Sequence, residues 1–201
     1  PLMGGQAGTT TMLIPFFGRI DLGLLYPLLF IPIGIVGASN MVNMLAGFNG
    51  AETGMAVIYL SNLGLYAYSH SRFSAAAISG VTVASLVAFY YYNRVPAKIL
   101  PGDSLTYLLG AVIVTIAVLG NIERAALIVS IPFIIEFILK ARGKFKKKSI
   151  GKLENGKIKS LYEKIYSIPH LLTRTGRFTE KQVVYFMILV QLIFSSLVWV
   201  I

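Results

Sequence analysis

Long apolar runs alternate with short polar stretches along most of the sequence. A helix needs about 20 residues to cross a bilayer, and shorter helices are tolerated, so most of these runs are long enough. The pattern therefore predicts membrane-spanning helices at residues 21–39, 55–68, 73–92, 104–119, 125–139 and 182–201. We expect an all-α fold, a polytopic transmembrane helix bundle that forms one integral-membrane domain over residues 1–201.

The composition agrees with a membrane protein. Hydrophobic residues make up 56% of the 201 residues and charged residues only 13%, about half the share of a soluble domain. Disulfides and thiolate metal sites are excluded because there is no cysteine. The formal net charge is +10, and most of the excess comes from one loop. Such a loop sets topology or meets anionic lipid more often than it binds nucleic acid, so we expect no nucleic-acid partner.

The basic loop, residues 140–181, predicts the orientation of the helices. Its first part, residues 140–164, holds ten lysines and arginines against two glutamates, which indicates a cytoplasmic loop. Counting helices backwards places residues 93–103 and 40–54 on the same side. All polar stretches with candidate chemistry therefore share one face, and we expect the active site on the cytoplasmic face.

The polar stretch between the first two apolar runs is the first candidate site. Asn40, Asn43 and Gly47 follow each other at three and four residues, so they share one face if the helix continues. Amide oxygens here, with Asn49 and Glu52 nearby, could coordinate a hard cation, and glycine backbone lets a flat ring approach. A polar helix cap followed by a glycine-rich turn is an equally good interpretation of the spacing.

Asp103 is the second candidate. The sequence has two aspartates, Asp21 and Asp103. Asp103 follows Pro-Gly at the start of an apolar run. It could cap the helix, which is worth about 1 kcal/mol, or it could bind Mg²⁺, which prefers one or two carboxylates plus phosphate oxygens. Because Asn43 lies on the same face, we favour a metal site made by Asn43 and Asp103, with Mn²⁺ as an alternative ion.

The basic loop supplies a third candidate. His170 and Arg174 are four residues apart, so on a helix they would share a face, and arginine binds phosphate bidentately. A solvated charge run is the alternative for these residues, and Arg142 and Lys144 could be ligands or topology signals. Two structural expectations complete the loop. Thr179 should cap the last span with Glu180 in its first turn, and Glu136 should pair with the basic loop.

Three motifs occur in a recognisable order: NMVNMLAGFNG at residues 40–50, PGDS at 101–104, and HLLTR at 170–174 followed by Thr179-Glu180. In this order they resemble the polyprenyl-phosphate N-acetylhexosamine-1-phosphate transferases (glycosyltransferase family 4). The similarity is greatest to the branch that uses UDP-GlcNAc and dolichyl phosphate, which includes archaeal members.

The resemblance implies that a lipid phosphate attacks the β-phosphorus of a UDP-sugar, releasing UMP and leaving a lipid-diphosphate sugar. By the same resemblance, Mg²⁺ is held at Asn43 and Asp103, and the nucleobase lies against Gly47 and Asn49. Leu100 falls where relatives can carry an aromatic that stacks on the base. The implied catalytic residues are Asn43, Asp103 and His170, and the implied substrate-binding residues are Asn40, Gly47, Asn49, Glu52, Leu100, Arg142, Lys144 and Arg174.

The sequence departs from this family in one respect. The family carries an aspartate pair on an earlier cytoplasmic loop, and no Asp-Asp occurs here. Met3-Gly4-Gly5 resembles a cytoplasmic turn of the family, yet the helix count places residues 19–21 outside. We therefore expect that the sequence is incomplete, with six spans of a ten-span fold and with residues missing before Pro1 and near residues 6–9. A continuous cDNA through residues 7 and 8 would contradict the internal gap.

The expected function is transfer of GlcNAc-1-phosphate from UDP-GlcNAc to dolichyl or another polyprenyl phosphate, the first membrane step of N-glycan-type assembly. The alternatives are a bacterial-type undecaprenyl-phosphate sugar-1-phosphate transferase for wall or O-antigen, a transporter or channel, and an inactive scaffold fragment. The expected location is the cell membrane in a prokaryote or the endoplasmic reticulum in a eukaryote. The expected partners are the two substrates, the bilayer and, as one candidate assembly, a second copy in a homodimer.

Overall fold

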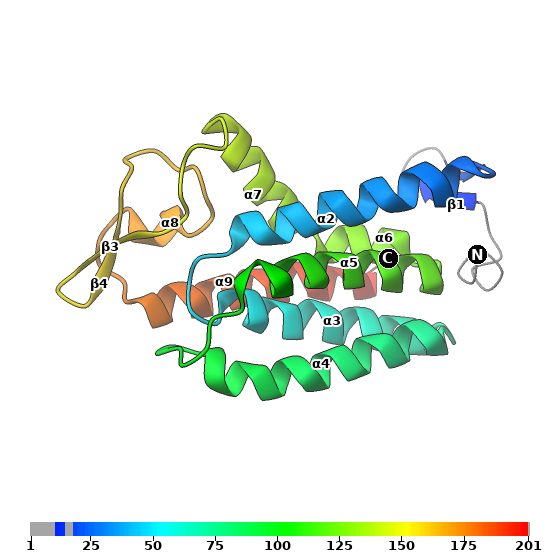
Figure 1. The fold of residues 1–201 in the computed structure, drawn as a ribbon, viewed down its shortest axis with the longest axis horizontal. Helices are drawn as coiled ribbons and strands as arrows, with labels where there is room; N and C mark the ends of the chain where they lie inside the picture. The colour runs from blue at the N-terminus through cyan, green and yellow to red at the C-terminus, as the bar shows by residue number, and fades with distance from the viewer. Residues whose placement is uncertain (1–10, 15–17, 201) are drawn as a thin grey trace.

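The computed structural model describes residues 11–14 and 18–200, with side chains from Asp21 onward. The Met3-Gly4-Gly5 turn and the expected gap near residues 6–9 lie outside these residues. Helices dominate the described chain (Figure 1). They are η1 (Tyr26–Phe30), α2 (Ile31–Leu45), α3 (Ala51–Ser69), α4 (Phe73–Asn93), α5 (Gly102–Gly120), α6 (Glu123–Val129), α7 (Ile131–Arg142), α8 (His170–Thr173), α9 (Glu180–Ser196) and η2 (Leu197–Val200).

Helix α3 lies inside the bundle. It packs against α4 on one side and α9 on another, while α2 packs along α5. Tyr59, Leu60 and Leu63 of α3 are fully buried, and the ring of Tyr59 meets that of Phe133 edge to face, with centroids 5.6 Å apart. By contrast, α4 leaves large apolar side chains such as Val81 exposed on its outer face, as expected for a surface in contact with lipid.

Among the described residues, four helical segments are long and apolar enough to cross a membrane, and they confirm the prediction of a polytopic helical membrane protein. They are Tyr26–Leu45, Phe73–Asn93, Gly102–Gly120 and Glu180–Val200. The other two predicted spans, 55–68 and 125–139, coincide with α3 and with the consecutive helices α6 and α7. The chain breaks between α6 and α7 beside Pro132, which has no backbone N–H to continue the helical hydrogen bonds.

Two small hairpins interrupt the helical fold that the sequence predicted. Strand β1 (Thr11–Ile14) pairs antiparallel with β2 (Gly18–Asp21), and β3 (Gly151–Glu154) pairs with β4 (Lys157–Ser160). The second hairpin turns at Asn155 and Gly156, which have positive φ values of 50° and 74°. Asn-Gly is the usual sequence for such a turn, so a signal for this hairpin was present in the basic loop.

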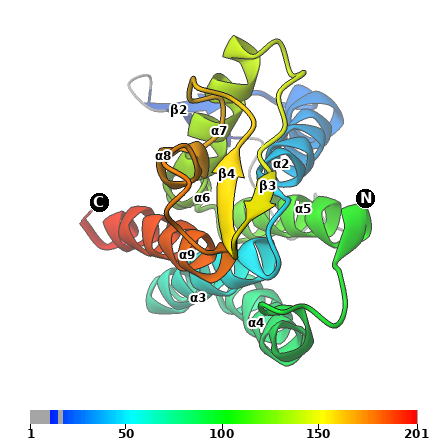
Figure 2. The same ribbon diagram turned by 90° about the vertical axis from the view of Figure 1, so that its left-hand side faces the viewer.

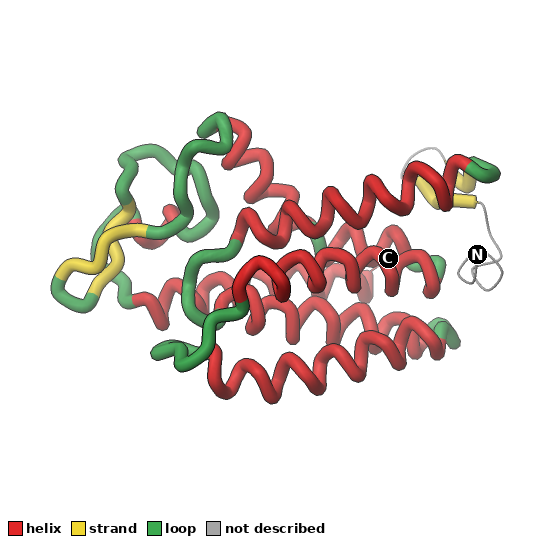
Figure 3. The backbone as a smooth tube through the Cα atoms, viewed as in Figure 1, coloured by secondary structure: helices red, strands yellow, loops and turns green. Residues whose placement is uncertain are grey.

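All the polar stretches with candidate chemistry lie at one end of the bundle. The α2–α3 loop, the α4–α5 loop and the segment from the end of α7 to the start of α9 meet at the left-hand end of Figure 1. Figure 2 looks onto this end, where β3, β4 and α8 cover the helix termini, and Figure 3 shows the loops gathered there. The structure therefore confirms that these stretches share one face.

Candidate functional site

Asn43 and Asp103 meet at this end of the bundle. Asn43 is in the last turn of α2 and Asp103 is in the first turn of α5. The side-chain Nδ2 of Asn43 donates to Asp103 Oδ1 at 2.9 Å and also lies 2.9 Å from Thr106 Oγ1. The N-cap of α5 is Pro101, so Asp103 is not the cap that the sequence allowed as an alternative. Its carboxylate instead connects two helices and is open to solvent.

A glycine allows α2 and α5 to approach closely enough for this pair. A side chain at Gly110 of α5 would collide with the backbone of Ala38 and Ser39 on α2. The Ser39 hydroxyl donates to the Tyr107 carbonyl at 2.8 Å across the same contact. Small residues allow such close packing between membrane helices, so Gly110 helps to fix the spacing between Asn43 and Asp103.

The oxygen donors around this pair fit a hard divalent cation. Asp103 offers carboxylate oxygens, and no hydrogen bond to the Asn43 amide oxygen is found among the described residues. No group of three or more His, Cys, Asp or Glu side chains that could hold a metal occurs in the described part of the chain. A cation here would thus be held by two side chains and would complete its shell with water or ligand oxygens, which is the usual state of Mg²⁺.

The helix ends before Gly47, so one expectation from the spacing is wrong. Helix α2 stops at Leu45, Ala46 is extended, and Gly47 has a φ of 145°, outside the range of most side chains. Gly47 therefore does not continue the face that carries Asn40 and Asn43. It lies instead in the short loop between α2 and α3.

Two carboxylates hold the backbone of this loop. The Gly47 N–H donates to Glu52 Oε1 at 2.6 Å, and the Asn49 N–H donates to Glu180 Oε1 at 3.0 Å. Glu52 is 8% exposed, and its second oxygen is buried without a hydrogen-bond partner. The loop is therefore fixed to the starts of both α3 and α9. Thr179 caps α9 with a capping box through Gln182, as predicted.

Two other candidates make no hydrogen bond to the Asn43–Asp103 pair. Asn40 is exposed, and its amide donates to the Val36 carbonyl of its own helix at 2.8 Å. Leu100 is 71% exposed on the α4–α5 loop. Both side chains lie at the same end of the bundle and remain accessible to a ligand.

The basic segment is anchored by a buried carboxylate. Glu136 is fully buried and lies 3.7 Å from Lys140 Nζ. It also accepts from Ser167 Oγ at 2.6 Å and from the Ile168 N–H at 2.8 Å. The predicted pairing of Glu136 with the basic loop is confirmed. In contrast, the candidates Arg142 and Lys144 are exposed and belong to neither ion pair found among the described residues.

His170 is fully buried, with both ring nitrogens bonded. Nδ1 accepts from the Tyr166 N–H at 3.2 Å, so Nε2 carries the proton and donates to the Lys148 carbonyl at 3.2 Å. Burial lowers the pKa of His170, and the charge of Lys140 lowers it further. Helix α8 is a single turn, and Arg174 beyond it is exposed. The Arg174 N–H donates to the His170 carbonyl at 3.2 Å, so the two residues are one helical turn apart as the spacing predicted, but only Arg174 is accessible to a ligand.

An apolar groove runs along the membrane part of the bundle from this end. It has a volume of about 370 Å³ and lies between α2, α5, α6 and α7. Met41 and Val42, next to Asn43, form part of its wall, and Phe133 forms another part. Gly37 also lines it, and a side-chain carbon added there would meet no atom within 4 Å. The groove could therefore hold a hydrocarbon chain, with Met41 and Val42 at the end of the groove nearer Asn43 in the sequence.

Residues 1–121 match the model of glycosyl transferase family 4. The matched part contains both Asn43 and Asp103, together with most of the apolar groove. The chain belongs to glycosyl transferase family 4.

The most similar relatives found include two archaeal proteins with the provisional name UDP-N-acetylglucosamine–dolichyl-phosphate N-acetylglucosaminephosphotransferase. The protein from Saccharolobus solfataricus is 39% identical over 92% of this chain and 58% of its own length. The protein from Sulfolobus acidocaldarius is 33% identical over 98% of this chain and 61% of its own length. A phospho-N-acetylmuramoyl-pentapeptide-transferase from Lactiplantibacillus plantarum is 35% identical over 61% of this chain and 38% of its own length. The chain thus spans about three fifths of the length of the archaeal relatives.

Proposed function

We propose that the chain forms part of an enzyme that transfers GlcNAc-1-phosphate from UDP-GlcNAc to dolichyl or another polyprenyl phosphate. The single observation that carries the proposal is the Asn43–Asp103 contact between α2 and α5, two helices that also form part of the wall of the apolar groove. A lipid substrate needs an apolar channel for its chain and a polar site for its phosphate, and here α2 and α5 carry both. The activity belongs to the full-length protein, of which this chain supplies these parts.

In the proposed reaction, an oxygen of the lipid phosphate attacks the β-phosphorus of UDP-GlcNAc. The new P–O bond forms as the bond from the β-phosphorus to the bridging oxygen breaks, and UMP leaves with that electron pair. The products are UMP and GlcNAc-diphospho-polyprenol. Phosphoryl transfer depends mainly on positioning and charge neutralisation, so the protein needs to hold the two phosphates in line and offset their charge.

Asn43 and Asp103 would hold a Mg²⁺ ion at the diphosphate. When bound, the ion supplies charge neutralisation for the phosphate oxygens, and Mn²⁺ has a similar preference for oxygen ligands. Arg142, Lys144 and Arg174 are exposed at the same end and are the candidates to contact the diphosphate or the sugar. His170 is enclosed in the segment that carries these cations, so we assign it a positioning role for that segment.

The loop between α2 and α3 is the candidate site for the nucleoside. Glu52 and Glu180 fix its backbone N–H groups, so the loop can present the Gly47 backbone and the Asn49 side chain in a set position. The Ile150 side chain packs against Gly47, with Cγ2 2.8 Å from where a Cβ would lie, so a base ring at Gly47 would contact Ile150 as well as the exposed backbone. Asn40 and Leu100 remain open beside it. We place this end of the bundle on the cytoplasmic side, because the basic segment lies there.

The archaeal relatives favour a dolichyl acceptor over the bacterial alternative. They align with more than nine tenths of the chain, whereas the bacterial relative aligns with 61% of it. The bacterial relative is nevertheless 35% identical over its aligned part, so an undecaprenyl-phosphate sugar-1-phosphate transferase is the second candidate function.

The proposal is tested with the purified full-length protein in nanodiscs. UMP release from UDP-GlcNAc is measured with dolichyl phosphate or undecaprenyl phosphate, in Mg²⁺, in Mn²⁺, and after metal removal with EDTA. We expect UMP release that needs the lipid phosphate, stops in EDTA and returns with Mg²⁺. A higher kcat/KM for dolichyl phosphate would favour the main candidate, and one for undecaprenyl phosphate would favour the second. Ion flux without UMP release would contradict both.

A further inference from the structure

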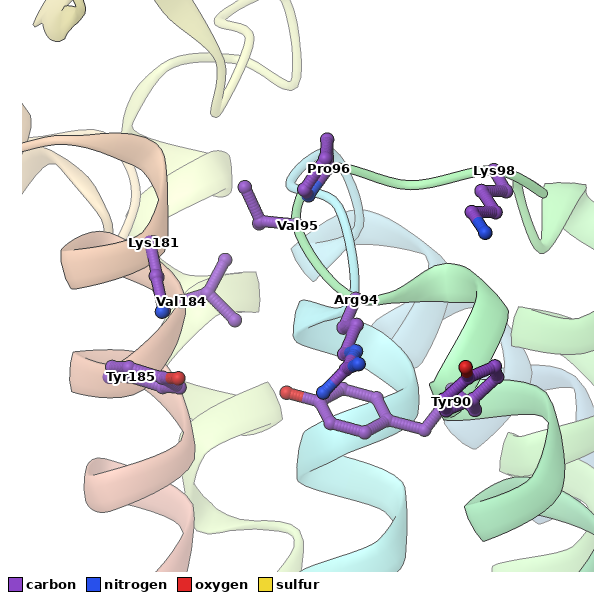
Figure 4. Close-up of a pocket in the computed structure, with 9 residues that line it drawn as sticks. Tyr90, Arg94, Val95, Pro96, Lys98, Lys181, Val184 and Tyr185 are labelled. Carbon is purple, nitrogen blue, oxygen red and sulfur yellow. The ribbon is translucent and has the colours of Figure 1, made fainter.

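A second cavity lies outside the Asn43–Asp103 site, between the end of α4 and the start of α9 (Figure 4). Its volume is about 400 Å³. In Figure 4, Lys181 and Tyr185 on α9 face Arg94 and Tyr90 across it, and Lys98 stands on the loop after α4. We call this cavity the α4–α9 pocket; its lining residues include neither Asn43 nor Asp103.

The α4–α9 pocket concentrates positive charge. Arg94, Lys98 and Lys181 line it, and no carboxylate does. The two ion pairs found among the described side chains, Lys140–Glu136 and Lys159–Glu154, involve none of these cations. Arg94 and Lys181 instead lie over tyrosine rings, at 5.1 Å from the Tyr91 centroid and 5.6 Å from the Tyr185 centroid.

The nearest acidic residue on α9 is directed elsewhere. Glu180 precedes Lys181 but does not line the pocket, and its Oε1 accepts the Asn49 N–H at 3.0 Å. An anion in the pocket would therefore meet three cations that have no carboxylate partner among the described residues. Each such cation near a membrane surface contributes about 1 kcal/mol to the binding of an anionic lipid.

The position of the pocket indicates a ligand from the membrane. It lies where two of the four candidate spans, Phe73–Asn93 and Glu180–Val200, reach the same end of the bundle. Further along these helices, Val87 and Leu189 are 54% and 53% exposed. Cations and tyrosines at the end of two spans, above exposed apolar side chains, match the headgroup and the acyl chains of a lipid.

The floor of the pocket contacts the loop that we assign to the nucleoside. A side-chain carbon at Gly50 would lie 3.1 Å from Tyr90 Cε2, and one at Gly54 would lie 3.3 Å from the same atom. The Tyr90 ring thus packs on the first turn of α3, directly after the loop with Gly47 and Asn49. A lipid bound above Tyr90 would stabilise this turn from outside the reaction site.

We propose that the α4–α9 pocket binds the phosphate of an anionic bilayer phospholipid between Arg94, Lys98 and Lys181. The site is separate from the Asn43–Asp103 pair, and the proposal does not depend on the transferase activity. The acceptor polyprenyl phosphate carries the same chemical group, so the experiment distinguishes the two lipid sources.

The test is retention of phosphatidylglycerol against phosphatidylcholine by the full-length protein, measured by native mass spectrometry. The wild type should retain phosphatidylglycerol selectively. Lys98→Gln, on an exposed loop, should lower its retention about fivefold, and the double variant Arg94→Gln/Lys181→Gln more than tenfold. The matched control is Lys152→Gln/Lys157→Gln, which removes the same charge from the exposed hairpin and should retain the lipid. Thermal unfolding in phosphatidylcholine checks that each variant is folded.

Equal retention by the pocket variants and the hairpin control would overturn the proposal, as would a wild type without preference for phosphatidylglycerol. Displacement of the lipid by millimolar inorganic phosphate would also overturn it, because a free anion would then suffice. Displacement of phosphatidylglycerol by equimolar polyprenyl phosphate would overturn the assignment to a bilayer phospholipid, because the acceptor would then occupy the pocket. Retention of phosphatidylglycerol in its presence would support the assignment.

Discussion

The side-chain amide of Asn43 donates to the carboxylate of Asp103 over 2.9 Å, although the two residues are 60 positions apart in the sequence. Asn43 lies in the last turn of α2 and Asp103 in the first turn of α5. The tight packing at Gly110 holds these two helices close together. The contact places two oxygen-bearing side chains on two helices that also line the apolar groove. The proposed function follows from this combination, and four features around it can be tested separately.

The first prediction concerns the carboxylate that holds the nucleoside loop. Glu52→Ala leaves the Gly47 N–H without its acceptor, so we expect the KM for UDP-GlcNAc to rise about tenfold, equivalent to one lost hydrogen bond to a charged group. Glu52→Gln keeps a carbonyl oxygen within hydrogen-bond distance of the Gly47 N–H and should raise this KM less. Steady-state kinetics at saturating lipid acceptor measures both. Equal KM values for Glu52→Ala and the wild type would contradict this role.

The second prediction concerns the groove. Gly37→Leu would project into the apolar groove, so it should raise the KM for the lipid acceptor about tenfold with little change for UDP-GlcNAc. The matched control is Gly80→Leu on α4, where an added side chain also meets nothing within 4 Å but no groove is present. If both leucine variants change the KM for the lipid acceptor to the same extent, the groove does not hold the acceptor.

The third prediction concerns stability. Glu136→Gln leaves the largely buried Lys140 without its counter-charge, and we expect it to lower the free energy of unfolding by about 3 kcal/mol in a denaturant titration. The comparison is Glu154→Gln, which breaks the exposed pair with Lys159 and should cost less than about 1 kcal/mol. A similar small loss in both variants would show that the Glu136 network is not an anchor.

The fourth prediction concerns pH. Burial lowers the pKa of His170 below its ordinary value of 6.5, so the unfolded segment takes up a proton below that pH while the folded segment does not. The stability of the segment should be constant above about pH 6.5 and fall as the pH drops below it. Hydrogen exchange of residues 144–170 at pH 7.5 and 5.5 measures this. His170→Gln should remove the dependence, whereas His70→Gln, at the other end of the bundle, should retain it.

The pattern of the sequence predicted the membrane helices and the shared face, because apolar runs and basic loops report directly on the bilayer. It also predicted the partnership of Asn43 with Asp103, although only the geometry of α2 and α5 brings them within hydrogen-bond distance. Thr106, which joins this pair, was missed, and its position three residues after Asp103 on the same helix was the available signal.

Other features depend on tertiary packing that spacing does not reveal. The spacing of Asn40, Asn43 and Gly47 suited a helix, but α2 ends at Leu45, and Gly47, with a positive φ, belongs to a loop. His170 is buried because distant parts of the basic segment close over it. The α4–α9 pocket arises because α3 separates two helices that are far apart in the sequence, so no local motif marks it.

The most direct test of the account is a double-mutant cycle on Asn43 and Asp103 in the full-length protein, with UMP release from UDP-GlcNAc as the readout. Asn43→Ala and Asp103→Asn should each lower kcat/KM at least about 100-fold, and Thr115→Val, which alters a hydroxyl bonded within α5, should leave it unchanged. If both residues act through one bound cation, the double variant should be no slower than the worse single variant. Losses that multiply in the double variant, or single variants with wild-type rates, would contradict the central claim.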